Sequence, residues 1–249
     1  MDAPTPPQRP SQKRGALVVA TILADFAWVA THIPVLGALG LADGEAGFYA
    51  GYQAGRCLIA GVAFAWALRS GWFSAPELGL AVGRHGPALR WLAKVAAVAL
   101  LAAAVVLVLG RLALPSLVCD LGERALRAPV VYPWPVFVRD TICMVLLAPL
   151  YEEIVYRALL LSALRERFKD PQALVIGGGV FVVLHYLYGY GWNTGYLLVA
   201  LALGWVFLRT GSILPGILLH AANNLWFTAS THARHTLGDA AILGWFCGP

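Results

Sequence analysis

The chain has 249 residues, of which 59% are hydrophobic and only 12% are charged, and its formal net charge is +5. Soluble domains carry roughly 25% charged residues, so this composition, with a mean hydropathy of +0.71, excludes an ordinary soluble domain and favours a polytopic α-helical membrane protein. The Lys and Arg residues fall in short hydrophilic gaps, which is typical of membrane orientation. We therefore expect no nucleic-acid partner.

The apolar segments predict an all-α fold. We expect a polytopic transmembrane helical bundle of about seven or eight membrane helices, with the catalytic core in the last four or five. The predicted spans are residues 15–41, 47–68, 92–112, 136–168, 171–188, 195–208 and 213–228. The predicted parts of the chain are a disordered cytoplasmic N-terminus (1–14), N-terminal helices and loops (15–135), a catalytic helical core (136–230), and a tail that could form a short helix (231–249).

Several polar residues interrupt the first two spans. Pro34 predicts a kink or an early end of the first span. Arg56 lies near the start of the second span, where we expect its side chain to extend outward to the interface. Asp25, His32 and Gln53 form no pattern with other polar residues, and we interpret them as structural or lumen-facing.

The basic residues predict an orientation. They precede the first span, occupy the loop of residues 69–90 with its short amphipathic piece, follow the fourth span at Arg165, Arg167 and Lys169, and follow the sixth span at Arg209. The alternate gaps are acidic, mixed or uncharged. By the positive-inside rule, the N-terminus is cytoplasmic, and we expect a multi-pass protein of the cell (inner) membrane.

Three local signals concern covalent links and helix packing. Four cysteines (Cys57, Cys119, Cys143 and Cys247) are scattered without metal-type spacing and predict neither a disulfide framework nor a zinc cluster. The triplet Gly177-Gly178-Gly179 favours a close approach of helices. Ser212 is a candidate N-cap for the last span, and Pro215 is tolerated in its first turn.

The strongest functional signal is a pair of adjacent carboxylates, Glu152 and Glu153, within an apolar run from Val136 to Leu164. An ionised carboxylate in hydrocarbon is costly, so such groups are normally paired, cavity-facing and functional. Arg157 lies four residues after Glu153, on the same helix face, and can pair with it. Glu152 lies on a different face and requires another partner.

Three further polar residues lie at a similar depth: His185, His220 and Asn224. A rise of about 1.5 Å per residue places them and Glu152 in one layer of the membrane. Asn223 is an alternative to Asn224, because it too can face His220. A single intramembrane His or Asn is commonly a helix–helix hydrogen bond, and a Glu–Arg pair alone can be structural. The agreement in depth favours a joint site.

These residue types permit peptide hydrolysis by an activated water. Glu152, without a local cation, is the predicted general base, and His185 is predicted to help hold the water. His220 and Asn224 can donate hydrogen bonds to the oxyanion of the tetrahedral intermediate. A small transporter or channel would instead have polar residues strung along a path through both leaflets.

The motifs occur in a fixed order: Glu152-Glu153-x-x-x-Arg157, Phe181-x-x-x-His185, Gly211-Ser212-Ile213-Leu214-Pro215 and His220-x-x-x-Asn224. This set, over about residues 136–227, resembles the CPBP family of CAAX-prenyl type II endopeptidases and their bacterial relatives, the CAAX protease and bacteriocin-processing (ABI) group. The resemblance implies a glutamate-type intramembrane endopeptidase in which the first Glu and the His of the second motif activate water. It also implies that the last His and Asn form the oxyanion hole.

The resemblance leaves the metal and the substrate open. Older interpretations of the family made it a zinc enzyme, and two Glu and two His could ligate zinc, but no His-Glu-x-x-His is present. We expect no cofactor, with zinc as the alternative. The expected partners are the lipid bilayer and a membrane-anchored protein or peptide, cleaved near a segment that could be C-terminal. The alternative function is a non-catalytic membrane immunity or partner protein on the same fold.

Overall fold

The computed structural model describes residues 11–38, 46–80, 82–114, 116, 119–120, 131–190, 193–239 and 247. Within these residues every regular element is helical, and the only β-type pairing is an isolated bridge between Leu80 and Ser212. The all-α prediction is therefore confirmed for this part of the chain. Two segments, Gln12–His32 and Asp170–Gly189, are long and apolar enough to cross a membrane by length and composition. The number of seven or eight spans stays a prediction.

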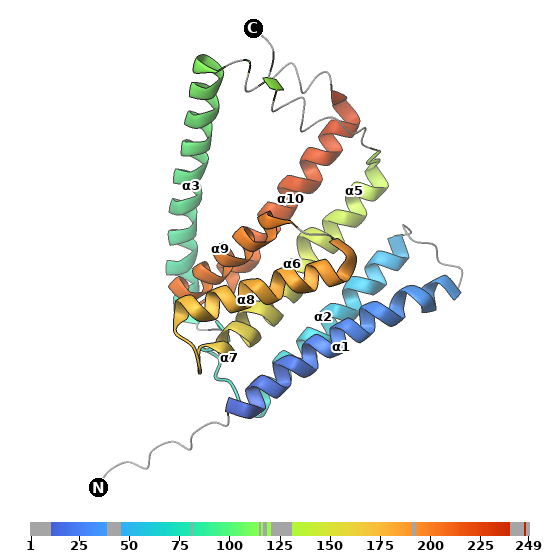
Figure 1. Cartoon of the computed structure of the whole chain (residues 1–249), viewed down its shortest axis with the longest axis vertical. Helices are drawn as coiled ribbons and strands as arrows, with labels where there is room; N and C mark the ends of the chain where they lie inside the picture. Colours follow the sequence, from blue (N-terminus) through green and yellow to red (C-terminus); the bar gives the residue numbers. More distant parts are fainter. Residues whose placement is uncertain are drawn as a thin grey trace.

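Helices α1 (Ser11–Ala38) and α2 (Ala46–Arg69) form an antiparallel pair along one side of the molecule (Figure 1). Helix α1 already begins at Ser11, so residues 11–14, which we predicted to be disordered, are helical. It also continues past Pro34, where we predicted a kink or an early end. A long apolar helix tolerates an internal proline, since the neighbouring backbone hydrogen bonds hold the chain on both sides of it.

The prediction for Arg56 is wrong. Its side chain is only 2% exposed, and its Nε atom lies 2.9 Å from Oδ1 of Asp25 on α1. An arginine extends toward the interface when no counter-charge is near, but here the carboxylate on the neighbouring helix neutralises it inside the protein. His32, which we interpreted as structural or lumen-facing, packs at a tilt against Trp28, with ring centroids 4.7 Å apart.

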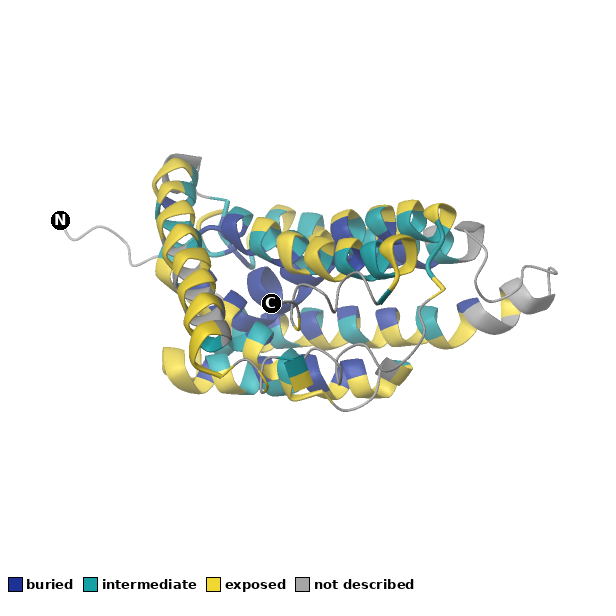
Figure 2. Ribbon diagram, turned by 90° about the horizontal axis from the view of Figure 1, so that it is seen from above, coloured by how far each residue is buried: buried dark blue, intermediate teal, exposed yellow. Residues whose placement is uncertain are grey.

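Helix α3 (Val82–Ala113) stands at the edge of the molecule (Figure 1). It begins ten residues before the predicted span, with Pro87 inside it, so the second half of the predicted 69–90 loop is helical. A proline in the second turn removes one backbone hydrogen bond and leaves the rest of the helix intact. Many of its large apolar side chains are exposed (Figure 2), as expected of a helix that faces lipid: Val98, Leu100, Leu101, Val105, Val108, Leu109 and Leu112.

The central segment runs without a break from Trp134 to Leu164. Its elements are α5 (Trp134–Asp140), η1 (Thr141–Leu147), α6 (Ala148–Glu152), η2 (Glu153–Leu161) and α7 (Ser162–Leu164). The η elements are π-helical, and π-helical turns are rare and occur mostly at functional sites. Nearly every residue of η2 is buried, because α1, α2, α8 and α9 all pack against this segment. The adjacent carboxylates therefore lie in the middle of the bundle.

The last helices form the other side of the bundle: α8 (Asp170–His185), η3 (Tyr186–Tyr190), α9 (Thr194–Thr210) and α10 (Leu214–Leu237). Gly189, at a φ of 88°, makes the kink after α8. Of the predicted glycine triplet, Gly178 permits the close approach, since a Cβ there would lie 3.2 Å from the Leu201 side chain of α9. Helix α10 has Pro215 in its first turn, as predicted, but its N-cap is Ile213, so the prediction of Ser212 as the N-cap is wrong. Ser212 lies one residue earlier, and its Oγ accepts from the Leu214 amide at 3.3 Å.

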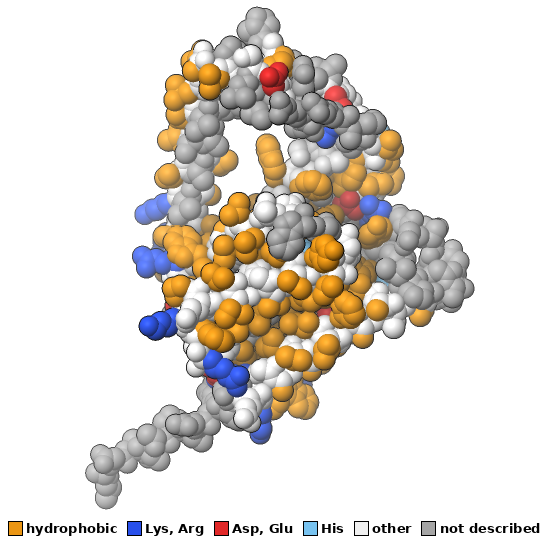
Figure 3. Space-filling view, in the orientation of Figure 1, with side chains coloured by type: hydrophobic (Ala, Val, Ile, Leu, Met, Phe, Trp, Pro, Cys, Tyr) orange, Lys and Arg blue, Asp and Glu red, His pale blue; other side chains and the backbone are white. Residues whose placement is uncertain are grey.

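One end of the bundle gathers four segments around Arg14. Its guanidinium pairs with Glu77, at 3.1 Å, and with Glu166, at 2.5 Å. The Ile213 amide donates to the carbonyl of Gly79 at 3.2 Å, which joins the start of α10 to the same end. The N-terminal part of α1 and the 165–169 turn thus lie together, while their position relative to a membrane stays a prediction. Figure 3 shows most visible Lys and Arg side chains toward this end, with hydrophobic side chains over the middle.

The opposite end contains a disulfide that sequence analysis missed. Cys119, beyond α3, is bonded to Cys247 near the C-terminus, across a sequence separation of 128 residues. We predicted no disulfide framework because the cysteine spacing shows no pattern, but a single long-range bridge needs none. Helix α10 extends to Leu237, so the first residues of the predicted tail (231–249) are helical. Residues 240–246 of that tail lie outside the described residues.

Candidate active site

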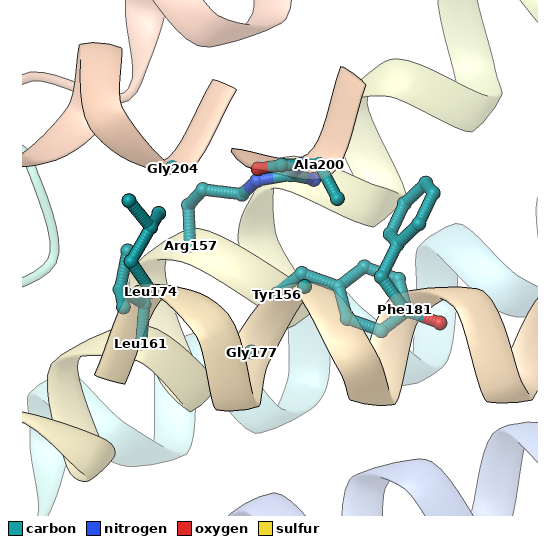
Figure 4. A pocket seen from close by; sticks show the side chains of 9 residues that line it. Tyr156, Arg157, Leu161, Leu174, Gly177, Phe181, Ala200 and Gly204 are labelled. Carbon is teal, nitrogen blue, oxygen red and sulfur yellow. The ribbon is translucent and has the colours of Figure 1, made fainter. Parts of the chain in front are cut away.

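The Glu153 carboxylate is fully buried and is held by two helices. Its Oε1 atom lies 2.9 Å from Nη1 of Arg157, as the spacing of four residues predicts, and 3.0 Å from Nδ1 of His220 on α10. Arg157 also donates from Nη2 to the Ala200 carbonyl of α9 at 3.4 Å, as Figure 4 shows, and its guanidinium lies over the Phe181 ring. Arg157 therefore joins the central segment to both helices of the α8–α9 hairpin.

Gly216 allows α10 to approach this carboxylate. A Cβ atom at this position would lie 2.7 Å from Oε2 of Glu153, which is closer than real Cβ contacts come. The glycine lies in the first turn of α10, where the positive end of the helix dipole favours a negative charge. The position of Glu153 therefore depends on the absence of a side chain at Gly216 as well as on its contacts with Arg157 and His220.

Glu152 faces two histidines across short gaps. Its Oε1 atom lies 3.9 Å from Nε2 of His185, and its Oε2 atom lies 3.7 Å from Nε2 of His220. These distances exceed a hydrogen bond, and Oε2 is buried without a hydrogen-bond partner among the described residues. Polar groups separated by slightly more than hydrogen-bond length are commonly bridged by water. The geometry of Glu152 suits a carboxylate that holds a water against an imidazole.

His185 is fixed in one orientation and one tautomer. Its Nδ1 atom lies 2.9 Å from the Phe181 carbonyl, which can only accept, so Nδ1 carries a proton and Nε2 of the neutral ring is an acceptor. The ring lies between the Phe181 ring, at 4.1 Å between centroids, and the Tyr196 ring of α9, at 4.9 Å. The acceptor nitrogen is therefore directed toward Glu152.

The two candidate asparagines on α10 have different environments. Asn224 is half-buried and donates from Nδ2 to the Met144 carbonyl at 2.7 Å, while its Oδ1 accepts from Asn223 at 3.3 Å. Met144 belongs to the π-helical segment η1, where the wider turn changes the backbone pairing. Asn223 is exposed. The geometry favours Asn224 over Asn223, because its amide is oriented by the backbone and retains one further N–H.

A cavity of about 120 Å³ brings most of these groups together. One water needs only about 10–15 Å³, so the cavity has room for several waters or a peptide group. Its lining residues are Gln53, Met144, Ala148, Glu152, Phe181, His185, Tyr196, Val199, His220, Asn223 and Asn224. Four of the six predicted site residues line it. Glu153 and Arg157 do not line it, but Glu153 lies 3.0 Å from Nδ1 of the lining residue His220, and Arg157 pairs with Glu153.

Sequence analysis missed two lining residues. Gln53 was interpreted as structural or lumen-facing and as forming no pattern with other polar residues, but it lines the same cavity as Glu152. Asp25 likewise belongs to a constellation, since it pairs with Arg56. Tyr196 was not singled out. A polar residue at membrane depth was the available signal for Gln53, but nothing in the sequence indicates which helix faces which.

Metal binding has weak geometric support. Both Nδ1 atoms of the site histidines are engaged, one by a backbone carbonyl and one by Glu153. Both Nε2 atoms face Glu152. Two His and one Glu are a donor set that zinc uses, but among the described residues no three such side chains converge closely enough to hold a metal ion.

Residues 134–226 match the model of a protein family described as type II CAAX prenyl endopeptidase Rce1-like. No curated protein and no solved structure matches the chain. The matched stretch begins at α5 and ends within α10, so it contains every predicted site residue and leaves out α1, α2 and α3. Over that stretch the chain is similar to this family, which consists of membrane-embedded proteases.

Proposed function

We propose that this protein is a glutamate-type intramembrane endopeptidase. It cleaves a peptide bond of a membrane-anchored protein or peptide near a segment that can be C-terminal. The observation that carries the proposal is the position of Glu152, whose two carboxylate oxygens face Nε2 of His185 and Nε2 of His220 at 3.9 and 3.7 Å within one buried cavity. The family match supports protease activity in general.

The water is activated by Glu152 and His185. A water in the gap donates one hydrogen to the acceptor Nε2 of His185 and the other to Glu152, which aligns its lone pair with the substrate carbonyl. As the oxygen attacks the carbonyl carbon, its proton passes to Glu152. When the tetrahedral intermediate collapses, the C–N bond breaks and Glu152 returns the proton to the leaving amine. Such general acid–base catalysis contributes about 10²–10⁴-fold in rate.

The oxyanion is stabilised from α10. His220 donates through Nδ1 to Glu153. When its ring carries both protons, Nε2 is a second donor and can serve the oxyanion. Asn224 offers the amide hydrogen that Met144 does not bind. Both residues lie on one face of the helix, and donors fixed in advance need no reorganisation when the charge develops. The support for this role is the orientation of each side chain by a second hydrogen bond.

The setting is a lipid bilayer, crossed about seven or eight times, with a cytoplasmic N-terminus in a cell (inner) membrane. The reaction requires no metal in this scheme, because the base, the water-holding imidazole and the oxyanion donors are all side chains. Zinc is the alternative that a metal assay decides.

Substrate trapping tests the proposal. The Glu152→Ala protein and the wild type are expressed in the native host, purified in detergent, and their co-purified peptides are identified by mass spectrometry. We expect membrane-anchored polypeptides enriched on Glu152→Ala, which purified wild-type protein then cleaves. A polypeptide that binds both proteins equally and stays intact would indicate the alternative, a non-catalytic immunity or partner protein. A thermal melt of both proteins confirms that the trap is folded.

A further inference from the structure

One wall of the reaction cavity comes from outside the stretch that matches the protease family. Gln53 of α2 is 5% exposed, and it lines the cavity together with Glu152 and His220. Its Oε1 atom is buried and has no hydrogen-bond partner in the described part of the chain. A buried amide oxygen without a partner is unfavourable, so its presence in a cavity calls for a ligand that supplies a donor.

Helix α2 is held firmly in this position. One turn beyond Gln53, Arg56 is paired with Asp25 of α1, and Asp25 Oδ2 accepts from the hydroxyl of Tyr188 at 2.5 Å. Tyr188 lies three residues after His185, at the end of the helix that carries it. The Arg56 guanidinium also lies 4.1 Å from the centre of the Tyr151 ring, next to Glu152 in the chain. Gln53 is therefore rigidly placed relative to the catalytic groups.

A second contact ties α2 to the central segment. Cys57, four residues after Gln53, donates from its thiol to the Leu147 carbonyl at 3.4 Å, at the end of the π-helical segment η1. The same segment contains Met144, whose carbonyl orients Asn224. Helix α2, which carries Gln53, and the side chain of Asn224 are thus both hydrogen-bonded to η1. This is the arrangement expected of a binding group and not of an incidental polar side chain.

A peptide substrate can supply the hydrogen-bond donor that Gln53 Oε1 lacks. The backbone of a peptide that enters a water-poor cavity brings N–H and C=O groups, each of which needs a partner. In the proposed reaction Glu152 and His185 hold the water, while His220 and Asn224 face the oxyanion. None of these four groups is left to accept a backbone N–H beside the scissile bond. An uncharged amide can accept it without adding a further negative charge beside Glu152 and Glu153.

We propose that Gln53 is a substrate-binding residue whose side-chain Oε1 accepts a backbone N–H of the peptide substrate beside the scissile bond. This inference rests on the proposed endopeptidase function. It assigns to α2, outside the family match, a part in positioning the substrate. Because the contact is made to the peptide backbone, it serves substrates of different side-chain sequence. It acts on substrate binding and on alignment, while the chemical groups themselves stay unchanged.

The test uses a library of fluorogenic peptides in detergent micelles, half with a farnesylated cysteine and half with a palmitoyl anchor. The peptide that the wild type cleaves best is used to measure KM and kcat for Gln53→Leu. Gln12→Leu makes the same chemical change at an exposed position of α1 and is the matched control. We expect Gln53→Leu to lower kcat/KM by roughly 10-fold or more, mainly through KM. The variant lacks the acceptor, so the backbone N–H of the bound peptide would be buried without a hydrogen-bond partner. Gln12→Leu should behave as the wild type.

A backbone ester scan of the same peptide identifies the contact. Each amide within three residues of the scissile bond is replaced in turn by an ester, which removes one N–H without adding bulk. We expect one position where the ester weakens cleavage by the wild type but causes no further loss in Gln53→Leu, the non-additive result of a removed pairwise contact. The melting temperature of Gln53→Leu should not fall, because leucine removes an unpaired buried oxygen.

Three results would overturn the inference. Equal KM for Gln53→Leu and wild type would show that Gln53 does not contact the peptide. Ester effects that add to Gln53→Leu at every position would show the same. A lower melting temperature with reduced kcat and unchanged KM would show a structural role. In each case the wild type cleaves the library, so the proposed function stands. If the wild type cleaves no member, the proposed function falls and the inference falls with it.

Discussion

Nδ1 of His220 lies 3.0 Å from Oε1 of Glu153, so the second carboxylate is directly bonded to the predicted oxyanion donor. Sequence analysis gave Glu153 only one partner, Arg157. The contact adds a second role, because the carboxylate also fixes the ring of His220 and directs its other nitrogen toward Glu152. Glu153 is thus a positioning residue between the cation on its own helix and the histidine on α10.

Replacing the two carboxylates should have different effects. Glu152→Gln keeps shape and hydrogen bonding but cannot accept the proton of water, so we expect a normal melt and a loss of about 10²–10⁴-fold in rate. Glu153→Gln leaves Arg157 buried without its counter-charge, and breaking such a pair costs roughly 3–5 kcal/mol. Its folded yield should fall together with its activity. Thermal melts in detergent beside a cleavage assay decide the matter, and an early melt of Glu152→Gln with a stable Glu153→Gln would reverse the assignment.

Gly216→Ala should damage the site without touching any catalytic atom. The added Cβ would lie 2.7 Å from Glu153 Oε2, so either α10 or the carboxylate must shift. We expect a lower melting temperature and reduced kcat. Gly179→Ala is the control, because a Cβ there meets nothing within 4 Å. That substitution within α8 should be neutral or stabilise by roughly 0.5–1 kcal/mol. Full activity of Gly216→Ala would show that the close approach is not required.

The buried pair of Asp25 and Arg56 should matter far more than an exposed one. Asp25→Leu alone leaves Arg56 as an unpaired buried cation, with an expected loss of roughly 3–5 kcal/mol, whereas the double variant Asp25→Leu/Arg56→Met should recover much of it. Arg165→Met breaks the exposed pair with Asp170 and should change stability by only about 0–1 kcal/mol. Melting temperatures of the four proteins compare these effects. A double variant no more stable than Asp25→Leu would contradict the charge argument.

The disulfide and the basic residues together predict which end of the protein faces the cytoplasm. Disulfides persist in oxidising compartments, and Lys and Arg are enriched on the cytoplasmic side. We expect Arg167→Cys, at the Arg14 end, to react with a membrane-impermeant maleimide only after the membrane is opened. Cys119 and Cys247 should react from outside in intact cells, but only after reduction. Labelling of Arg167→Cys in intact cells would place that end outside.

The purified protein should contain no stoichiometric zinc, and a chelator should leave peptide cleavage unchanged. The reason is that the base and both oxyanion donors are supplied by side chains in the proposed reaction. Elemental analysis of the wild type is the measurement. About one zinc per chain, lost in both His185→Ala and His220→Ala, would replace the water-activation scheme with that of a metalloprotease.

The sequence by itself determined the class of the protein and the candidates for its site. Low charge and long apolar segments predicted helices, and spacings of four residues paired Glu153 with Arg157 because residues one turn apart share a helix face. The depth argument, based on a constant rise per residue, selected His185 on one helix and His220 and Asn224 on another. All of these inferences depend on the geometry within one helix, which can be calculated from the spacing of residues in the sequence.

Only the tertiary structure decided how the helices face one another. It placed Gln53 in the cavity, paired Arg56 with Asp25, joined Cys119 to Cys247, and set His220 between both carboxylates. Each of these contacts joins residues far apart in the chain. Their geometry depends on the crossing and rotation of packed helices, which many small side-chain contacts determine together. A pattern of spacings within one helix contains no record of that rotation.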